Sequence, residues 1–352
     1  MPSTRVRGSS CFVLLSLATA LGCGSSGGDE PASTPTPAPS ATPGFANARG
    51  FVLSSFGFVF PEGSGDACPG GFNRGPIEMQ AAGETPLPDD CLDPTANDDP
   101  GFKTLDTTGT LDGLDIDDTV SRRDDAQQCA HDDFPAPGGP AGVDDQLWRA
   151  IGCIRGFQDG DVVESVVDGA VRDGSMTILV DVQGVDDPVN DDDVRVQVFS
   201  SRDAPPLGGD GSVLPHGTLS IDPDARYHSS VASGRIENGV VIAGPLDIRI
   251  RLNIQIVVGD LSFRDAYVRL ELQPDGSARG GIFGFAPLED VYEIFGRQAG
   301  TIGGKEALGY TCSGLYAALT SQADGHFDDA SGRCSSLSTA YRFDGIPAFV
   351  AR

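Results

Sequence analysis

Residues 246–256 read Leu-Asp-Ile-Arg-Ile-Arg-Leu-Asn-Ile-Gln-Ile, and this stretch decides the fold class of the chain. From Leu246 to Ile256 every second residue is a large aliphatic one, and every residue between them is polar. Successive side chains of a strand point to opposite faces, so the stretch predicts a long antiparallel strand with one buried and one solvated face. Residues 266–272 repeat the pattern.

Four consecutive strands are expected in this part of the chain, over residues 234–243, 245–258, 261–273 and 277–285. Turn sequences that suit antiparallel neighbours occur at Asn238–Gly239, Gly259–Asp260 and Pro274–Gly276. Strands of this length with one apolar face need a second layer to cover that face. The sequence therefore predicts a mainly β fold, an antiparallel β-sandwich or open barrel with a few short helices, stabilised by disulfides.

Shorter signals mark the other elements. Period-2 alternation takes over from about residue 161, and further strands are expected at Met176–Val182, Val194–Phe199 and Tyr341–Val350. Helical spacing of apolar residues predicts an amphipathic helix over Val143–Ile154. Two short helices are expected, one after Pro287 and one over Leu315–Leu319.

The net charge excludes one class of function. The 352 residues include 51 acidic and 24 basic ones, which gives a formal charge of −27. A chain this acidic cannot neutralise a run of phosphates, so we expect no nucleic-acid partner. Aspartate, which prefers turns, helix caps and metal sites, makes up most of the acidic residues.

The N-terminus has the pattern of an export signal. Arg5 and Arg7 precede a twelve-residue apolar run over residues 11–22, which is too short to span a bilayer and suits a signal-peptide core. The residues Ala20-Leu21-Gly22-Cys23 resemble the lipobox of bacterial lipoproteins, although that motif usually has Leu first and Ala or Ser second. The resemblance implies lipidation of Cys23 after removal of residues 1–22; the alternatives are an ordinary secretory signal or a buried thiol.

A tether follows this signal. Residues 24–43 contain five prolines and no large apolar side chain, so they predict an extended spacer. In lipoprotein families Gly after the lipidated Cys implies sorting to the outer membrane, and Gly24 stands there. We expect a protein of the cell envelope, held at the outer membrane by its N-terminal lipid and facing either the periplasm or the surface.

The folded part is expected in two segments after the signal at 1–22 and the lipidated tether at 23–43. Residues 44–160 form a Cys- and Asp-rich N-terminal module, and residues 161–352 form an antiparallel β domain with short C-terminal helices. Six cysteines fall in these segments: Cys68, Cys91, Cys129, Cys153, Cys312 and Cys334. An even number in an exported chain indicates disulfides, and pairing of sequence neighbours is the simplest expectation. The absence of any Cys-x-x-Cys spacing argues against zinc or haem.

Aspartates gather in four places: residues 112–118, residues 132–145, residues 186–193 and residues 324–329. Calcium takes six to eight oxygen ligands from carboxylates and carbonyls in flexible loops. The first group supplies the candidate ligands Asp112, Asp115 and Asp117, and residues 186–193 are a second candidate. None matches the helix–loop–helix spacing, and the alternative is solvated turns, where Asp is common.

Catalysis has little support in the sequence. The chain has four His and no Gly-x-Ser-x-Gly elbow. The acidic content leaves one alternative open, a secreted glycan hydrolase that uses paired Asp or Glu carboxylates. The principal expectation is a binding or structural surface module, stabilised by calcium, whose protein or glycan ligand the sequence does not identify.

One further resemblance covers about residues 60–160. Four segments occur in order: Cys68-Pro-Gly-Gly-Phe-Asn73, Leu111-Asp-Gly-Leu-Asp115, Cys129-Ala-His-Asp-Asp-Phe134 and the run from Gly142 to Cys153. Together they resemble a group of secreted or lipid-anchored bacterial proteins with no assigned activity, in which Asn is usual where Asp145 stands here. The resemblance implies that the acidic loop and the Cys-flanked helix belong to one module.

Overall fold

The alternating stretch lies in strand β8 (Val240–Ile254), and its alternation is visible in the burial of its residues. Leu246, Ile248 and Ile250 are buried, whereas Asp247 and Arg249 are exposed. The computed structural model describes residues 48–63, 83, 90–99, 101–106, 109–126, 128–254, 257–301 and 310–352. The expectations for the signal, Cys23, the tether and Cys68 concern residues outside these ranges.

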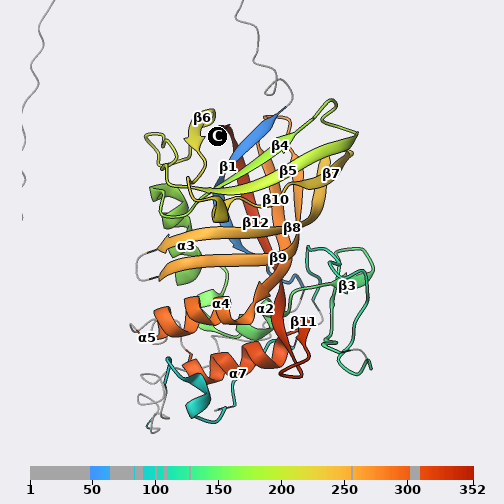
Figure 1. The fold of residues 1–352 in the computed structure, drawn as a ribbon, viewed down its shortest axis with the longest axis vertical. Helices are drawn as coiled ribbons and strands as arrows, with labels where there is room; N and C mark the ends of the chain where they lie inside the picture. The colour runs from blue at the N-terminus through green and yellow to red at the C-terminus, as the bar shows by residue number, and fades with distance from the viewer. Residues whose placement is uncertain are drawn as a thin grey trace, which may run out of the picture. The chain divides into compact units, whose positions relative to one another are not determined.

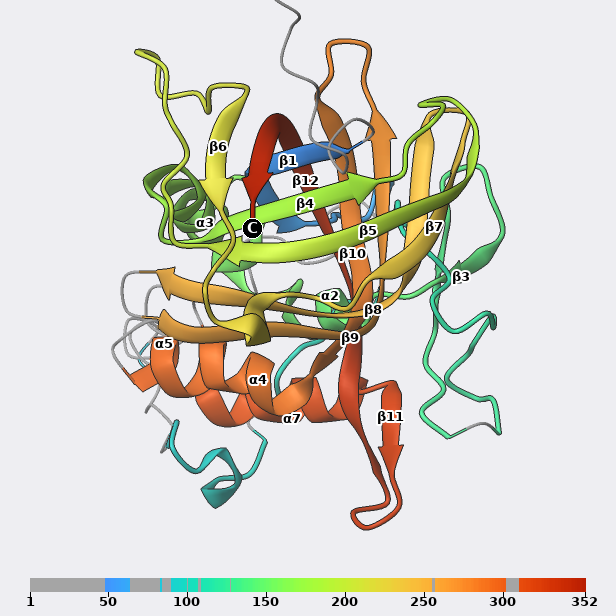
Figure 2. The ribbon, with the colours of Figure 1, turned by 45° about the horizontal axis from the view of Figure 1, so that its top comes forward.

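Eight antiparallel strands form a closed ring (Figures 1 and 2). In ring order they are β1 (Arg49–Phe58), β4 (Thr177–Gln183), β5 (Asp191–Ser201), β7 (Ala232–Glu237), β8, β9 (Val257–Leu272), β10 (Ala278–Pro287) and β12 (Arg333–Ala351). The long β12 closes the ring because it pairs with β10 on one side and with β1 on the other. The mainly β, antiparallel fold with few short helices is therefore confirmed. The sequence predicted a sandwich or an open barrel, and the pairing of β1 with β12 closes the barrel.

Smaller strands attach to this ring. Strand β6 (Gly217–Ser220) runs parallel to β12, and β11 (Gly325–Asp328) runs antiparallel to it. Strands β2 (Phe134–Pro135) and β3 (Ala141–Val143) form a separate two-stranded sheet. The final strand expected at Tyr341–Val350 is part of β12.

The meander β7–β8–β9–β10 is confirmed, with different strand ends. Asn238 and Gly239, both with positive φ, form the turn between β7 and β8, as expected. Gly259–Asp260 is not a turn, because both residues lie inside β9 and pair with β8. The break expected near residue 244 is instead a register shift within β8. At that point Gly244 is required, because a Cβ would lie 2.5 Å from the ring of Tyr267. Strands β8 and β9 are both strongly bent along their length (Figure 2).

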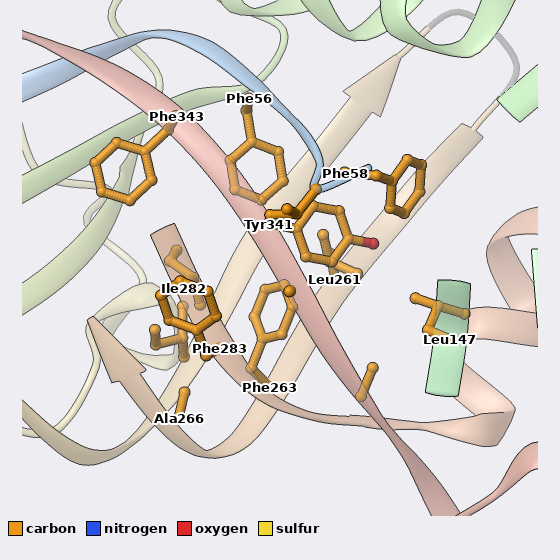
Figure 3. Close-up of a cluster of buried hydrophobic side chains, with 14 of the residues drawn as sticks. Phe56, Phe58, Leu147, Leu261, Phe263, Ala266, Ile282, Phe283, Tyr341 and Phe343 are labelled. Atoms are coloured by element: carbon orange, nitrogen blue, oxygen red, sulfur yellow. The ribbon is translucent and has the colours of Figure 1, made fainter. Parts of the chain in front are cut away.

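Aromatic side chains fill one part of the ring's interior (Figure 3). Tyr341 of β12 stacks on Phe56 of β1 with ring centroids 4.8 Å apart, and it contacts Phe58 at 4.9 Å and Phe263 at 5.4 Å. These residues come from β1, β9 and β12, so the closure of the ring and the packing of its core depend on the same side chains.

Helices lie at one end and along one side of the ring (Figure 1). They are η1 (Pro94–Ala96), α2 (Gln146–Ile151), η2 (Arg155–Phe157), α3 (Val162–Asp173), η3 (Ala225–Tyr227), α4 (Leu288–Tyr292), the π-helix η4 (Glu293–Gln298), α5 (Ala299–Thr301) and α7 (Cys312–Gln322). The helices expected after Pro287 and around Leu315–Leu319 are confirmed. The helix expected over Val143–Ile154 is present as the shorter α2, because the side chain of Asp145 caps its start and a turn at Gly152 ends it.

Helix α3 corrects the expectation that alternation takes over at residue 161. The carboxylate of Asp161 accepts a hydrogen bond from the N–H of Val162, and Gly174 ends the helix with φ +84°. Val163, Val167 and Val171 recur every four residues along one side of the helix. Valine favours strands, so the many valines of α3 indicate a strand although their spacing is that of a helix.

The disulfides correct a second expectation. Cys91 bonds to Cys312 and Cys129 bonds to Cys334, so the pairing of sequence neighbours is wrong. Cys153 is also disulfide-bonded. The entropy of closing a loop rises only slowly with its length, so proximity in sequence decides little once the fold brings distant segments together.

The described residues all belong to one unit, residues 43–352. The boundary expected near residue 160 falls within this unit, since β1 pairs with β4 and β12.

Candidate functional site

Two segments distant in sequence meet at an acidic site beside the ring. The loop from Leu111 to Thr119 lies against Val143 and Asp144 and forms hydrogen bonds with both the backbone and the side chain of Asp144. The N–H of Ile116 donates to Oδ2 of Asp144 at 2.8 Å, and the N–H of Asp144 donates to the carbonyl of Leu114 at 3.2 Å. Because Leu111, Ile116 and Val143 are buried, the hydrophobic core holds both segments in place.

Three carboxylates converge at this contact. One oxygen each from Asp115, Asp117 and Asp144 lies within 4.8 Å of the others. Asp133 lies next to Asp144, and its Oδ2 accepts a hydrogen bond from the N–H of Ser121 at 2.5 Å. We call Asp115, Asp117, Asp133 and Asp144 the acidic cluster.

Among the described residues, the acidic cluster has no compensating positive charge in contact with it. Within the described part of the chain, none of its four carboxylates forms an ion pair with Lys, Arg or His. Burial raises the pKa of Asp144 to about 9, with further contributions from the charges of Asp133 and Asp117. Burial likewise raises the pKa of Asp133 to about 6 and also raises that of Asp115. Without a cation, therefore, the site holds protons that carboxylates ordinarily lose.

Local backbone features orient the ligand oxygens. The N–H of Thr119 donates to Oδ1 of Asp117 at 2.8 Å and to Oδ1 of Asp115 at 3.1 Å, which leaves the second oxygen of each carboxylate free of this bond. Gly142, with φ +119°, lies against Asp115, and a Cβ there would be 2.9 Å from Oδ2 of Asp115. A larger residue at position 142 would therefore displace this carboxylate.

The donor set fits calcium. Calcium–oxygen distances are about 2.3–2.6 Å, so two ligands on opposite sides of the ion are about 5 Å apart. The separation of at most 4.8 Å between the oxygens of Asp115, Asp117 and Asp144 is within this limit. All donors are carboxylate oxygens, which calcium prefers, and the partly exposed loop leaves room for water.

The structure brings together two of the three predicted metal ligands. Asp115 and Asp117 converge, and Asp144, which sequence analysis placed in another acidic group, joins them. Asp112 is directed elsewhere, because its Oδ2 accepts a hydrogen bond from Nη2 of Arg269 at 2.6 Å. No short motif could place Asp144 with Asp115 and Asp117, because its position depends on the packing of Ile116.

The other acidic groups form turns, apart from Asp324, whose Oδ1 accepts a hydrogen bond from the N–H of Ser338 at 2.7 Å. In residues 186–193 the carboxylate of Asp191 accepts hydrogen bonds from the N–H groups of Asp186, Asp187 and Asp193. In residues 324–329 the carboxylate of Asp328 accepts from Ala330 and Ser331 in the same way. These side chains satisfy their own backbone, as aspartate does in turns.

The remaining polar residues of the motif around α2 are buried and structural. Oδ1 of Asp145 caps the helix at the N–H of Trp148, 3.0 Å away. The side chains of Gln146 and Arg149 both donate to the carbonyl of Asp132 at 3.0 Å. Because these contacts fix Asp132, they also position the neighbouring Asp133 of the acidic cluster.

A serine–histidine–aspartate array that sequence analysis missed lies at strand β11. Nδ1 of His326 is 2.6 Å from Oγ of Ser336, and Nε2 is 3.0 Å from Oδ2 of Asp265. Both His326 and Asp265 have positive φ, a strained conformation that occurs at functional sites. Ser336 is fully buried, however, so its hydroxyl is closed to a substrate. The residues are far apart in sequence, and no local signal could have linked them.

A charged groove of about 470 Å³ runs across the outer face of β1, β9, β10 and β12 beside α3. Its lining includes the carboxylates of Asp112, Glu164, Asp168, Glu271 and Asp344 and the guanidiniums of Arg269, Arg279 and Arg342. Most of these carboxylates have an arginine partner, for example Glu164 with Arg342 at 2.9 Å. Burial raises the pKa of one of them, Asp168, although Arg172 lies 3.3 Å from it.

Comparison with known proteins does not add to this picture. No protein-family model, no curated protein and no solved structure matches the chain. Within the described residues, no helix is both long and apolar enough to cross a bilayer. The fold and the site define a disulfide-bonded, mainly β protein with an acidic cluster next to its ring of strands.

Proposed function

We propose that this chain is a lipid-anchored module of the bacterial cell envelope that binds calcium through Asp115, Asp117 and Asp144 and has a binding or structural role. The observation that carries the calcium site is the convergence of three carboxylate oxygens within 4.8 Å of one another. They come from two segments that the core holds together, and the described residues provide no basic partner for them.

Calcium would stabilise the contact between these segments. Bound ions replace the protons that the buried carboxylates otherwise retain, and they remove the repulsion between Asp117, Asp133 and Asp144. Ligation by Asp115 and Asp117 on one side and Asp144 on the other would join the loop to the residues that precede α2. A ligand that binds only the folded state stabilises it in proportion to the logarithm of its concentration.

Thermal melting of the disulfide-intact protein tests this site. Calcium at 100 times its Kd contributes about 2.7 kcal/mol, which for a chain of this size raises Tm by about 4 °C relative to EDTA. The Asp117→Asn variant keeps an oxygen for the N–H of Thr119 but loses the charge, so its melting temperature should not respond to calcium. Asp192→Asn, an exposed aspartate of β5, removes the same charge elsewhere and should respond as the native protein does. An unchanged Tm in the native protein would overturn the calcium site.

The anchor rests on the sequence and is supported by the cysteines. Lipidation of Cys23 would attach the chain to the outer membrane, and residues 24–43 would hold the folded unit away from it. Oxidised cysteines are typical of proteins outside the cytoplasm, and Cys91, Cys129, Cys312 and Cys334 are paired. Mass spectrometry of the mature N-terminus tests the anchor: we expect diacylglycerol on Cys23, and an unmodified Cys23 would contradict it.

We do not propose the alternative of a glycan hydrolase. The carboxylates of the charged groove are mostly bound by arginine, and the buried Ser336 is closed to substrate. The acidic cluster does contain carboxyls of raised pKa, as general acids do, but neither the charged groove nor the apolar pocket described below includes it.

A further inference from the structure

An apolar pocket lies between α3, the β8–β9 hairpin and η4. Its volume is about 230 Å³, and none of the side chains that the structure describes fills it. Its lining is almost entirely hydrophobic and comes from β1, α3, β8, β9, η4 and β12. Phe56, Phe58 and Tyr341, the aromatic residues that close the ring, are part of its lining.

The pocket is open at its outer side. Val162 of α3 is exposed, and Val163, Val166, Ile254 and Val257 are only partly buried. Apolar side chains at the border of an open cavity are exposed to water, so a ligand that covers them lowers the free energy of the system. The volume is far too small for a helix or a protein segment, because a helix is about 10–12 Å across, and it suits a small molecule.

The pocket adjoins the charged groove. Phe56, Gly57 and Glu164 line both, so the apolar pocket and the charged groove are continuous at these residues. A ligand that occupies both spaces has an apolar tail and a polar head. The groove has five carboxylates and three guanidiniums, so its net negative charge disfavours an anionic head, whereas a head that carries both charges can meet both kinds of side chain.

We propose that this pocket and groove bind a single-chain lipid with a zwitterionic headgroup, the acyl chain between α3 and the β8–β9 hairpin and the headgroup near Glu164 and Arg342. This names a ligand for the binding role proposed above. It does not depend on calcium, so its failure is distinguishable from failure of the calcium site.

Calorimetric titration of the full chain with lauroyl lysophosphatidylcholine, below its micellar concentration and with calcium present, tests the proposal. We expect saturable binding of one molecule per chain, and binding of laurate at least about tenfold weaker. The Val163→Trp variant fills the pocket from α3 and should weaken lysophosphatidylcholine binding at least about tenfold. Val189→Trp, which places the same side chain at an exposed position outside the pocket, should bind as the native chain does.

Three results would overturn the proposal: no saturable binding by the native chain, equal binding by Val163→Trp, or laurate binding as tight as that of the zwitterionic lipid. Circular dichroism of each variant shows whether it is folded. If Val163→Trp fails to fold, Val166→Trp takes its place with the same expected loss, because Val166 lies about one helical turn further along α3 and lines the same pocket.

Discussion

The N–H of Ile116 donates a hydrogen bond of 2.8 Å to the carboxylate of Asp144, and this bond joins the acidic loop to the segment that precedes α2. Asparagine at position 144 keeps an oxygen for this bond and resembles the protonated carboxyl that burial favours, since the pKa of Asp144 is raised to about 9, but it cannot supply the negative charge that calcium needs. We therefore expect Asp144→Asn to melt at the same temperature as the native protein in EDTA, or at a higher one, and to lose the response to calcium. Asp144→Ala, which also loses the bond, should melt lower in both conditions. A native calcium response in Asp144→Asn would contradict the assignment of this ligand.

The pH dependence of stability follows from Asp133 and Asp144 of the acidic cluster and from Asp324, whose charge interacts with that of Asp133. Burial raises the pKa of Asp133 to about 6, of Asp324 to about 7 and of Asp144 to about 9 in the folded chain, above the ordinary value of 3.8. Between about pH 4 and pH 9 the folded protein thus holds more protons than the unfolded one, and its stability falls as pH rises. Melts in EDTA should show Tm decreasing from about pH 5 to pH 9, with calcium reducing the decrease. A Tm that rises over this range in EDTA would contradict the account.

The long-range disulfides can be checked by peptide mapping without reduction. We expect linked peptides that contain Cys91 with Cys312 and Cys129 with Cys334. The first bond joins residues 221 positions apart, and its removal by Cys91→Ala and Cys312→Ala together should cost about 2–5 kcal/mol of stability. Linked peptides that join Cys129 to Cys153, or Cys312 to Cys334, would contradict the arrangement of segments described here around these cysteines.

Two buried tyrosines should respond in opposite ways to loss of their hydroxyl. The hydroxyl of Tyr341 is buried in the ring near Asp145 and Thr339, and among the described residues it makes no hydrogen bond of normal geometry. Tyr341→Phe should therefore be neutral or stabilising by up to about 1 kcal/mol. The hydroxyl of Tyr292 donates to the carbonyl of Cys91 at 3.1 Å, and Tyr292→Phe should cost about 1 kcal/mol. Chemical denaturation measures both, and a larger loss in Tyr341→Phe than in Tyr292→Phe would contradict the packing described for the ring.

The sequence predicts the strands of the meander because their burial depends on a local period. Residues 246–254 alternate as the side chains of β8 do, and Asn238–Gly239 has the chemistry of its turn. Local signals mislead where two preferences compete. The valines of α3 favour strands, and only Asp161 before them and Gly174 after them mark a helix. The apolar pocket was missed with this helix, because α3 forms one of its walls.

The acidic site was predicted only in part, for a different reason. Asp115 and Asp117 are close in sequence, and their spacing indicates a shared site. Asp144 reaches them through the packing of Ile116 and Val143, which no spacing records. The pairing of Cys91 with Cys312 and of Cys129 with Cys334 likewise depends on which segments the ring of strands brings together.

Calorimetric titration of the EDTA-stripped, disulfide-intact protein with calcium tests the central claim most directly. The account predicts saturable binding of one ion per chain for the native protein and for Asp192→Asn, and loss of this binding in Asp117→Asn and in Asp144→Asn. Absence of saturable binding in the native protein, or undiminished binding in both Asp117→Asn and Asp144→Asn, would contradict it.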